Sequence, residues 1–133
     1  MRDLILSAAF GAALCGSALA AAPAPWTPDG KVCNNTGTTV EIMVCLDART
    51  KVWDARLNQA YQALTAMLKA DPADPGQLDK LRAAQRLWLQ YRNANCGFYD
   101  AEQGTIREID AAECMHRMTQ DRAIELQQAG PQG

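Results

Sequence analysis

The sequence predicts an all-α protein: a small disulfide-linked bundle of three helices, in which a long antiparallel hairpin is followed by a third helix. Three long segments place apolar residues at three- and four-residue intervals, which is helical periodicity. Short segments rich in proline or glycine separate them, and an N-terminal export signal leaves four cysteines in the mature chain. With 133 residues, 48% of them hydrophobic and 21% charged, the composition is that of one soluble globular domain.

The charge balance argues against nucleic acid as a partner. Thirteen lysines and arginines face fifteen aspartates and glutamates, which gives a formal net charge of -2. A protein that binds nucleic acid neutralises phosphates with a basic excess, and this chain has none.

Residues 1–20 are predicted to be a cleaved secretory signal peptide. A basic start at Arg2 precedes a largely apolar run from Leu4 to Leu14, and Ala18-Leu19-Ala20 fits the A-x-A cleavage pattern. The apolar run is shorter than the roughly 20 residues of a membrane-spanning helix, which disfavours an uncleaved anchor. Lipoprotein processing at Cys15 is disfavoured as well, because it requires a small residue in the place of Leu14. We therefore expect a periplasmic or secreted protein with no membrane span after cleavage.

The four cysteines of the mature chain are predicted to form two disulfides. An even number of cysteines in an exported chain is typical of a disulfide framework. A zinc site is the competing interpretation, but the sequence has no C-x-x-C pair and a single histidine, His116. The prediction includes no metal and no cofactor. The four residues are Cys33, Cys45, Cys96 and Cys114.

Residues 21–37 are rich in proline, glycine and asparagine and are predicted to be an extended leader to a helical domain over 38–129. The first helix is expected over about 39–70, with Thr38 or Thr39 as its cap and Glu41 in its first turn. Its apolar stripe comprises Leu46, Trp53, Leu57, Ala60, Leu64 and Met67.

Two prolines and a glycine within residues 71–76 predict a tight antiparallel return. The second helix is expected over about 77–96, a loop over 95–104, and the third helix over about 105–128. The predicted inner face of the second helix comprises Leu78, Leu81, Ala84, Gln85, Trp88, Tyr91 and Arg92. The predicted inner face of the third comprises Ile106, Ile109, Cys114, Met118 and Leu126.

Several polar residues lie on the predicted apolar seam of the hairpin. A return centred near residue 73 would pair Asp54 with Arg92, Asn58 with Trp88, and Tyr61 with Gln85. Buried polar groups are costly unless they are paired, and paired groups usually belong to the fold itself. We therefore interpret five of them as a structural polar network rather than a binding site: Asp54, Asn58, Tyr61, Gln85 and Arg92.

Three ordered motifs carry a resemblance to a known family. Trp53 to Tyr61 (WDARLNQAY) matches D-x-x-L-N-x-x-Y, and Leu81 to Phe98 matches Q-x-x-W-x-x-x-R with a cysteine four residues later. Cys114 to Leu126 (CMHRMTQDRAIEL) fits the closing pattern. Over residues 33–127 the chain resembles the lysozyme-inhibitor LprI-like family of small exported bacterial domains. The resemblance implies a small helical bundle, and it implies lysozyme as a partner.

No constellation for catalysis is visible, and the prediction is that the protein is not an enzyme. His116 lies beside Cys114 and Arg117, neither of which makes a catalytic triad with it. A small paired-carboxylate hydrolase is the less favoured alternative, because acids on a helix surface are usually solvated. Its carboxylates would come from Asp100, Glu102, Glu108, Asp110 and Glu113.

The most suggestive binding segment is Gly97 to Gly104 (GFYDAEQG). Its aromatic residues Phe98 and Tyr99 are candidate anchors, and the neighbouring acids Asp100 and Glu102 suit a basic protein such as lysozyme. Two functions remain open: an envelope binding protein that inhibits lysozyme, and a structural or stress-related periplasmic protein that does not bind it. The partner is then lysozyme or another envelope protein, and the sequence makes no prediction of oligomeric state.

Helical geometry favours one of the three possible disulfide connectivities. In the hairpin register, Cys45 and Cys96 are offset by about five residues, or roughly 7 Å along the axis. Bonded cysteines usually have Cα atoms about 4.4–6.8 Å apart, and the interhelix separation adds to the offset. Cys33 in the leader can fold back onto the first helical turns beside Cys45, and Cys114 follows the loop that Cys96 begins. The predicted pairs are therefore Cys33–Cys45 and Cys96–Cys114.

Overall fold

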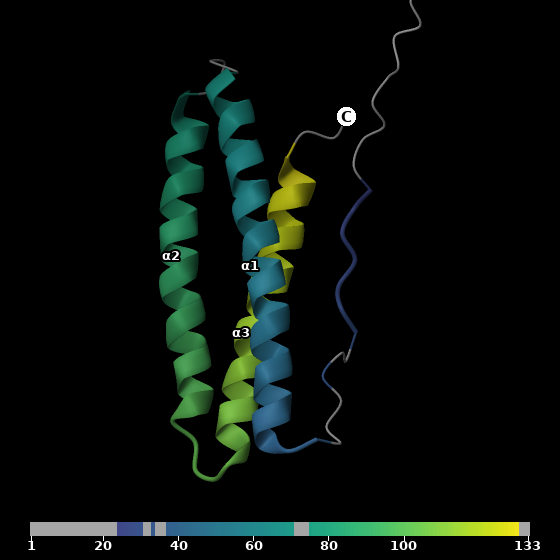
Figure 1. The fold of residues 1–133 in the computed structure, drawn as a ribbon. Helices are drawn as coiled ribbons and strands as arrows, with labels where there is room; N and C mark the ends of the chain where they lie inside the picture. The colour runs from purple at the N-terminus through teal and green to yellow at the C-terminus, as the bar shows by residue number, and fades with distance from the viewer. Residues whose placement is uncertain (1–23, 31–32, 34–36, 71–74, 131–133) are drawn as a thin grey trace, which may run out of the picture.

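Three long helices form the protein, in agreement with the predicted all-α bundle (Figure 1). A computed structural model describes residues 24–30, 33, 37–70 and 75–130. The helices are α1 (Thr39–Ala70), α2 (Pro75–Asp100) and α3 (Ile106–Ala129), and the described residues include no strand. No helix in this part of the chain is long and apolar enough to cross a membrane. The predicted signal peptide and residues 71–74 of the predicted return lie outside the described residues.

A reciprocal cap fixes the start of α1. The backbone N–H and hydroxyl of Thr38 donate to the carboxylate of Glu41 at 2.8 and 2.9 Å, and the N–H of Glu41 donates back to Thr38 Oγ1 at 3.3 Å. This is the capping box that a threonine three residues before a glutamate predicts. The hydrogen bonds from the backbone N–H and hydroxyl of Thr38 hold the pKa of Glu41 below its usual value.

The hydrophobic core lies mainly between α1 and α3, and it has two parts. The larger cluster comprises Trp53, Leu57, Ala60, Leu64, Ala123 and Leu126. The smaller cluster, nearer the start of α1, comprises Ile42, Leu46 and Ile109. Helix α3 packs against both other helices, whereas the α1–α2 interface is the smallest of the three. The two arms of the predicted hairpin are therefore held together chiefly through α3.

Helix α2 is longer than predicted and buries less of its surface. Gly97 does not end it, because the N–H of Ala101 still donates to Gly97 O at 3.2 Å. The glycine that the connection to α3 requires is Gly104, whose φ of 94° lies in the left-handed region. Two residues that were expected to face inward are in fact exposed, Tyr91 at 61% and Ile106 at 55%. Ala84 is exposed as well.

Both predicted disulfides are present. Cys33 is bonded to Cys45 with Cα atoms 5.8 Å apart, and Cys96 is bonded to Cys114 with Cα atoms 5.5 Å apart. The first bond ties the leader to α1, and the second ties the last part of α2 to α3.

The predicted polar pairs between α1 and α2 were wrong, because the partners of the α2 residues lie on α3. Gln85 Oε1 accepts a 3.1 Å hydrogen bond from Arg122, and Arg92 donates to the hydroxyl of Thr119 at 3.1 Å. The reason is the position of α3, which occupies the seam that a two-helix register assigns to α1.

The remaining members of that network lie on α1. Asn58 donates to Asp54 one turn earlier at 3.3 Å, and both side chains are exposed. Tyr61 is half-buried and packs against the larger core cluster.

Candidate functional site

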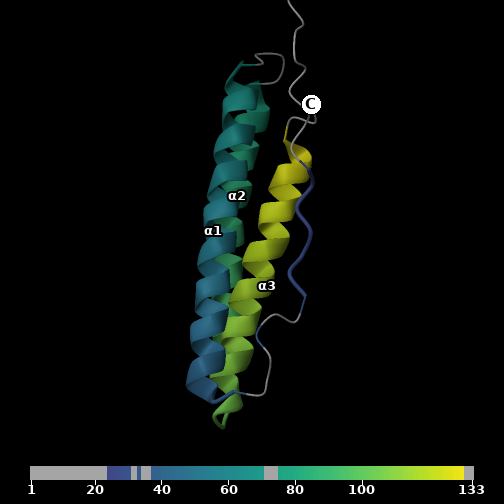
Figure 2. The same ribbon diagram turned by 45° about the vertical axis from the view of Figure 1, so that its right-hand side comes forward.

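Residues 24–30 of the leader form an ordered strap along the bundle, which we call the leader strap. In Figures 1 and 2 it runs beside α3 without regular secondary structure. Trp26 packs edge-on against Trp53 of α1, with ring centroids 6.4 Å apart and planes at 81°. The guanidinium of Arg56 lies over both rings, 4.4 Å from the Trp53 centroid and 5.8 Å from that of Trp26. The strap therefore covers one edge of the larger core cluster.

Two glutamines of α3 hold the backbone of the leader strap. Gln127 Oε1 accepts from the N–H of Trp26 at 2.7 Å, and its Nε2 donates to the carbonyl of Ala24 at 3.2 Å. Gln120 Oε1 accepts from the N–H of Asp29 at 2.7 Å. The two side-chain amides lie seven residues apart, on the same face of the helix. They form hydrogen bonds to the backbone of the strap, as a neighbouring strand does in a sheet. An extended segment with no sheet beside it obtains its hydrogen bonds in this way.

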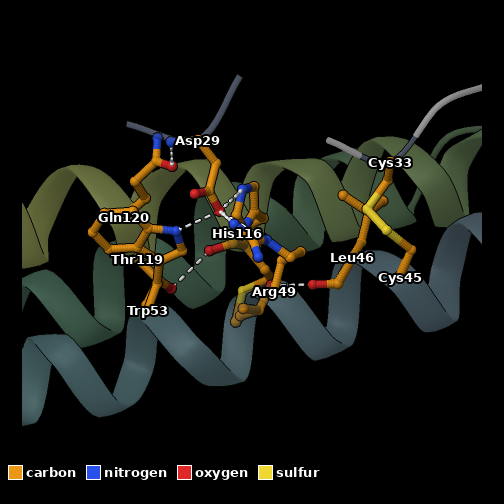
Figure 3. Close-up of polar contacts among 11 residues, drawn as sticks. Asp29, Cys33, Cys45, Leu46, Arg49, Trp53, His116, Thr119 and Gln120 are labelled. Atoms are coloured by element: carbon orange, nitrogen blue, oxygen red, sulfur yellow. Dashed lines mark hydrogen bonds and ion pairs between the residues drawn. A yellow bond between two sulfur atoms is a disulfide. The ribbon is translucent and has the colours of Figure 1, made fainter. Parts of the chain in front are cut away.

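Asp29 binds several polar side chains and lies between Trp53 of the larger core cluster and Leu46 of the smaller one (Figure 3). Its Oδ2 accepts from Trp53 Nε1 at 2.7 Å and from Arg49 Nε at 2.9 Å, and it forms an ion pair with Arg49. Partial burial alone would raise the pKa of Asp29, but the hydrogen bonds from Arg49 and Trp53 and the charge of Arg49 outweigh it. The net result is a pKa below the ordinary value of 3.8.

His116 lies near the same oxygen of Asp29, with Nε2 3.9 Å from Oδ2, and its side chain is 12% exposed. Burial lowers its pKa, the charge of Asp29 opposes that shift, and the charge of Arg49 reinforces it. The pKa lies below 6.5 as a net result, so the neutral imidazole predominates at pH 7. His116 Nδ1 is buried and has no hydrogen-bond partner among the described residues.

The arrangement around Asp29 and His116 suits anchoring better than catalysis. The 3.9 Å separation is longer than a hydrogen bond, so the carboxylate does not orient the imidazole as a base. The neighbouring hydroxyls of Thr50 and Thr119 donate to the backbone carbonyls of Leu46 and Met115, both at 2.7 Å. Within the described ranges, no group of three or more histidine, cysteine or acidic side chains is placed to hold a metal ion.

The predicted binding residues lie together at the carboxyl end of α2, which we call the α2-end patch (Phe98, Tyr99, Asp100 and Glu102). The first three belong to the last turn of the helix rather than to a loop, and only Glu102 lies in the connection. Phe98 is 65% exposed and stacks edge-on against the half-buried Tyr99, with ring centroids 5.4 Å apart. Both acidic side chains face solvent. The Cys96–Cys114 disulfide fixes the base of the patch.

Sequence reasoning missed the Asp29 cluster. Polar residues inside two apolar stripes were the available signal of this cluster. Arg49 falls between Leu46 and Trp53, and Gln120 lies three residues before Ala123. A lone acid in a proline-rich leader gives no sign of which helix it meets, because its partners are up to 91 residues away.

Comparison with known proteins places the fold in a family. The family model described as "Lysozyme inhibitor LprI" matches residues 31–126. An uncharacterized protein of Rhizobium meliloti is 30% identical over 125 residues, which cover 86% of this chain and 87% of that protein. No solved structure matches the chain significantly. The match spans most of the sequence and all three helices, and the chain therefore belongs to the LprI lysozyme inhibitor family.

Proposed function

We propose that the protein is an exported envelope protein that binds lysozyme and inhibits it by protein–protein contact. The observation that supports this most directly is the match to the lysozyme inhibitor family over residues 31–126, which contain both disulfides. Disulfides persist in oxidising compartments outside the cytosol, which suits a chain that begins with a signal-like segment. The proposed function is binding, with no catalytic step.

The α2-end patch is the surface we assign to lysozyme. Phe98 presents an apolar ring that a partner could bury, and Tyr99 beneath it limits the ring's freedom. Asp100 and Glu102 supply exposed negative charge, which complements a basic enzyme and speeds its approach. Because the disulfide beneath the patch orders it before binding, little conformational entropy is lost on association.

The test is a lysozyme assay on a suspension of bacterial cell walls. Mature protein at stoichiometric ratio should slow the clearing of the suspension, and Phe98→Ala should weaken the inhibition by about tenfold or more. The double variant Asp100→Asn, Glu102→Gln should weaken it most at low salt. Asp47→Asn, an exposed acid on α1, is the matched control and should inhibit as the natural protein does.

Two results would contradict the proposal. No slowing of lysozyme at large molar excess would remove the inhibitor function and leave a structural or stress-related envelope protein. Full inhibition by Phe98→Ala would show that lysozyme binds outside the α2-end patch. Export is tested separately, since the mature protein from its native host should begin near Ala21.

A further inference from the structure

We propose that the protein forms a twofold-symmetric dimer through an exposed apolar stripe on α2. The stripe consists of residues at the three- and four-residue steps of one helix face: Ala84, Leu87, Tyr91, Ala94 and Phe98. Leu87, Tyr91 and Phe98 are 64%, 61% and 65% exposed. Large apolar side chains at successive turns of one face are the pattern of a helix that packs against another helix.

The fold leaves this stripe uncovered. Helix α2 contributes only Gln85 and Cys96 to the buried residues, and its contacts with α3 include the hydrogen bonds of Gln85 and Arg92 and the Cys96–Cys114 disulfide, on a different side of the helix. The core clusters include Leu81 and Trp88 of α2 as partly buried neighbours and none of the five stripe residues. Apart from the edge contact of Phe98 with Tyr99, the stripe is therefore left uncovered by the described residues of its own chain.

The sizes of the side chains match when two copies of the stripe run antiparallel about Tyr91. Phe98 and Ala84 lie at equal distances from Tyr91, so each large ring of one copy meets the small residue of the other. Tyr91 meets its own counterpart at the twofold axis, and Leu87, four residues before it, lies opposite Asn95 of the other copy. A parallel pair would instead place Phe98 against Phe98 and alanine against alanine, which packs poorly.

The charges at the two ends of the stripe also match in this orientation. Lys80 lies on the same face one turn before Ala84, and Glu102 follows the end of α2. Both side chains are exposed, and both lie eleven residues from Tyr91 in the sequence. Antiparallel association brings Lys80 of each copy to Glu102 of the other, whereas a parallel pair brings like charges together. Size and charge together indicate a second copy as the occupant, through an isologous interface.

This dimer is independent of the proposed lysozyme contact but shares Phe98 and Glu102 with the α2-end patch. Dimer and lysozyme complex would therefore compete for the same surface. The experiment that tests the dimer contains no lysozyme, so its outcome is distinguishable from a failure of inhibition.

The test is sedimentation equilibrium of the mature, oxidised protein from about 1 μM to about 1 mM, the range in which a small interface dissociates. The mass should rise from one chain to two. Tyr91→Glu places two carboxylates at the axis and should raise the dimer dissociation constant by more than about tenfold. Leu89→Glu, at a 39% exposed leucine on another side of α2, is the matched control and should dimerise normally. Circular dichroism checks that both variants remain folded.

A charge reversal tests the orientation. Lys80→Glu should weaken the dimer because it places two glutamates together at both ends, and the double variant Lys80→Glu, Glu102→Lys should restore it. Lys80 and Glu102 of one chain are roughly 30 Å apart at helical rise, so a rescue reports contact between copies. A monomer throughout the concentration range, a dimer unaffected by Tyr91→Glu, or no rescue by the double variant would overturn the proposal. If the protein is a monomer and a separate assay shows that Tyr91→Glu abolishes lysozyme binding, the stripe belongs to the lysozyme contact instead.

Discussion

The indole N–H of Trp53 donates a 2.7 Å hydrogen bond to the carboxylate of Asp29, and this bond joins a fully buried side chain of α1 to the leader strap. A tryptophan can be buried without cost only when its one polar group is paired. The acceptor comes from outside the helices, so the core of the bundle is complete only when the leader strap is in place.

Replacement of Asp29 by alanine should lower the free energy of unfolding by about 1–3 kcal/mol. The variant leaves the N–H of Trp53 without its acceptor and removes the ion pair of Arg49. Asp47→Ala is the control, because it breaks only an exposed pair with Lys51 and should cost about 0.5 kcal/mol or less. Urea unfolding measures both, and equal losses in the two variants would show that Asp29 has no special role.

The stability of the protein should fall as the pH drops below about 6.5. The folded protein lowers the pKa of His116, so the unfolded chain takes up a proton that the folded chain resists. Protonation therefore favours unfolding from pH 6.5 down to the lowered pKa. His116→Gln should flatten this part of the curve in urea unfolding from about pH 5 to about pH 8. An unchanged slope in the variant would assign the dependence to another group.

A second loss of stability should follow in acid because of Asp29. Its pKa is lower in the folded protein, so its contribution is fully present above its unfolded value of 3.8. The contribution is lost as the pH falls through the lowered pKa. In Asp29→Asn the loss of stability in acid should be smaller. The loss of stability that protonation of His116 causes below about pH 6.5 should change less. Loss of the His116 step alone in this variant would contradict the assignment.

The helices could be predicted from the sequence because their signals are local. Apolar spacing and the cap at Thr38 and Glu41 depend on residues within a few turns of one another, and the predicted bounds of α1 match the structure. The pairing of Cys96 with Cys114 could also be reached, because it closes a short connection. Each of these inferences needs only the geometry of one helix or of two adjacent ones.

The polar contacts could not be predicted, because they depend on how the third helix is placed. A two-helix register pairs Gln85 with Tyr61, whereas the structure pairs it with Arg122, which is 37 residues away. Buried polar groups indicate that partners exist without identifying them. Ala84 and Tyr91 were assigned to the interior for a related reason, since apolar periodicity shows that a face exists but not what covers it.

Gln85 and Arg122 should behave as a coupled pair in a double-mutant cycle. Arg122→Met leaves the buried Gln85 without its donor, and we expect a loss of about 1–3 kcal/mol. Adding Gln85→Leu should recover part of that loss, because both polar partners are then replaced by apolar groups. Additive losses in the double variant, measured by urea unfolding, would show that the two residues act independently.

Removal of either disulfide should destabilise the protein by about 3 kcal/mol. The Cys96–Cys114 bond spans 18 residues and the Cys33–Cys45 bond spans 12, so the first should contribute slightly more. Thermal unfolding of two double variants measures these contributions. One combines Cys96→Ala with Cys114→Ala, and the other combines Cys33→Ala with Cys45→Ala. A cross-linked peptide joining Cys45 to Cys96 in non-reducing mapping would contradict the pairing itself.

The hydrogen bond between Trp26 and Gln127 connects residues 101 positions apart, so the start and the end of the fold depend on each other. The leader strap leaves the ribosome before the three helices, and its partners on α3 leave last. Asp29 and the leader strap therefore stay in water until residues 116–127, which carry their partners on α3, have been made. A chain truncated before α3 would leave the strap undocked and Trp53 open to water, exposed to proteases that act on unfolded segments. Docking of α3 against α1 and the leader strap is thus the step at which the protein becomes resistant to degradation.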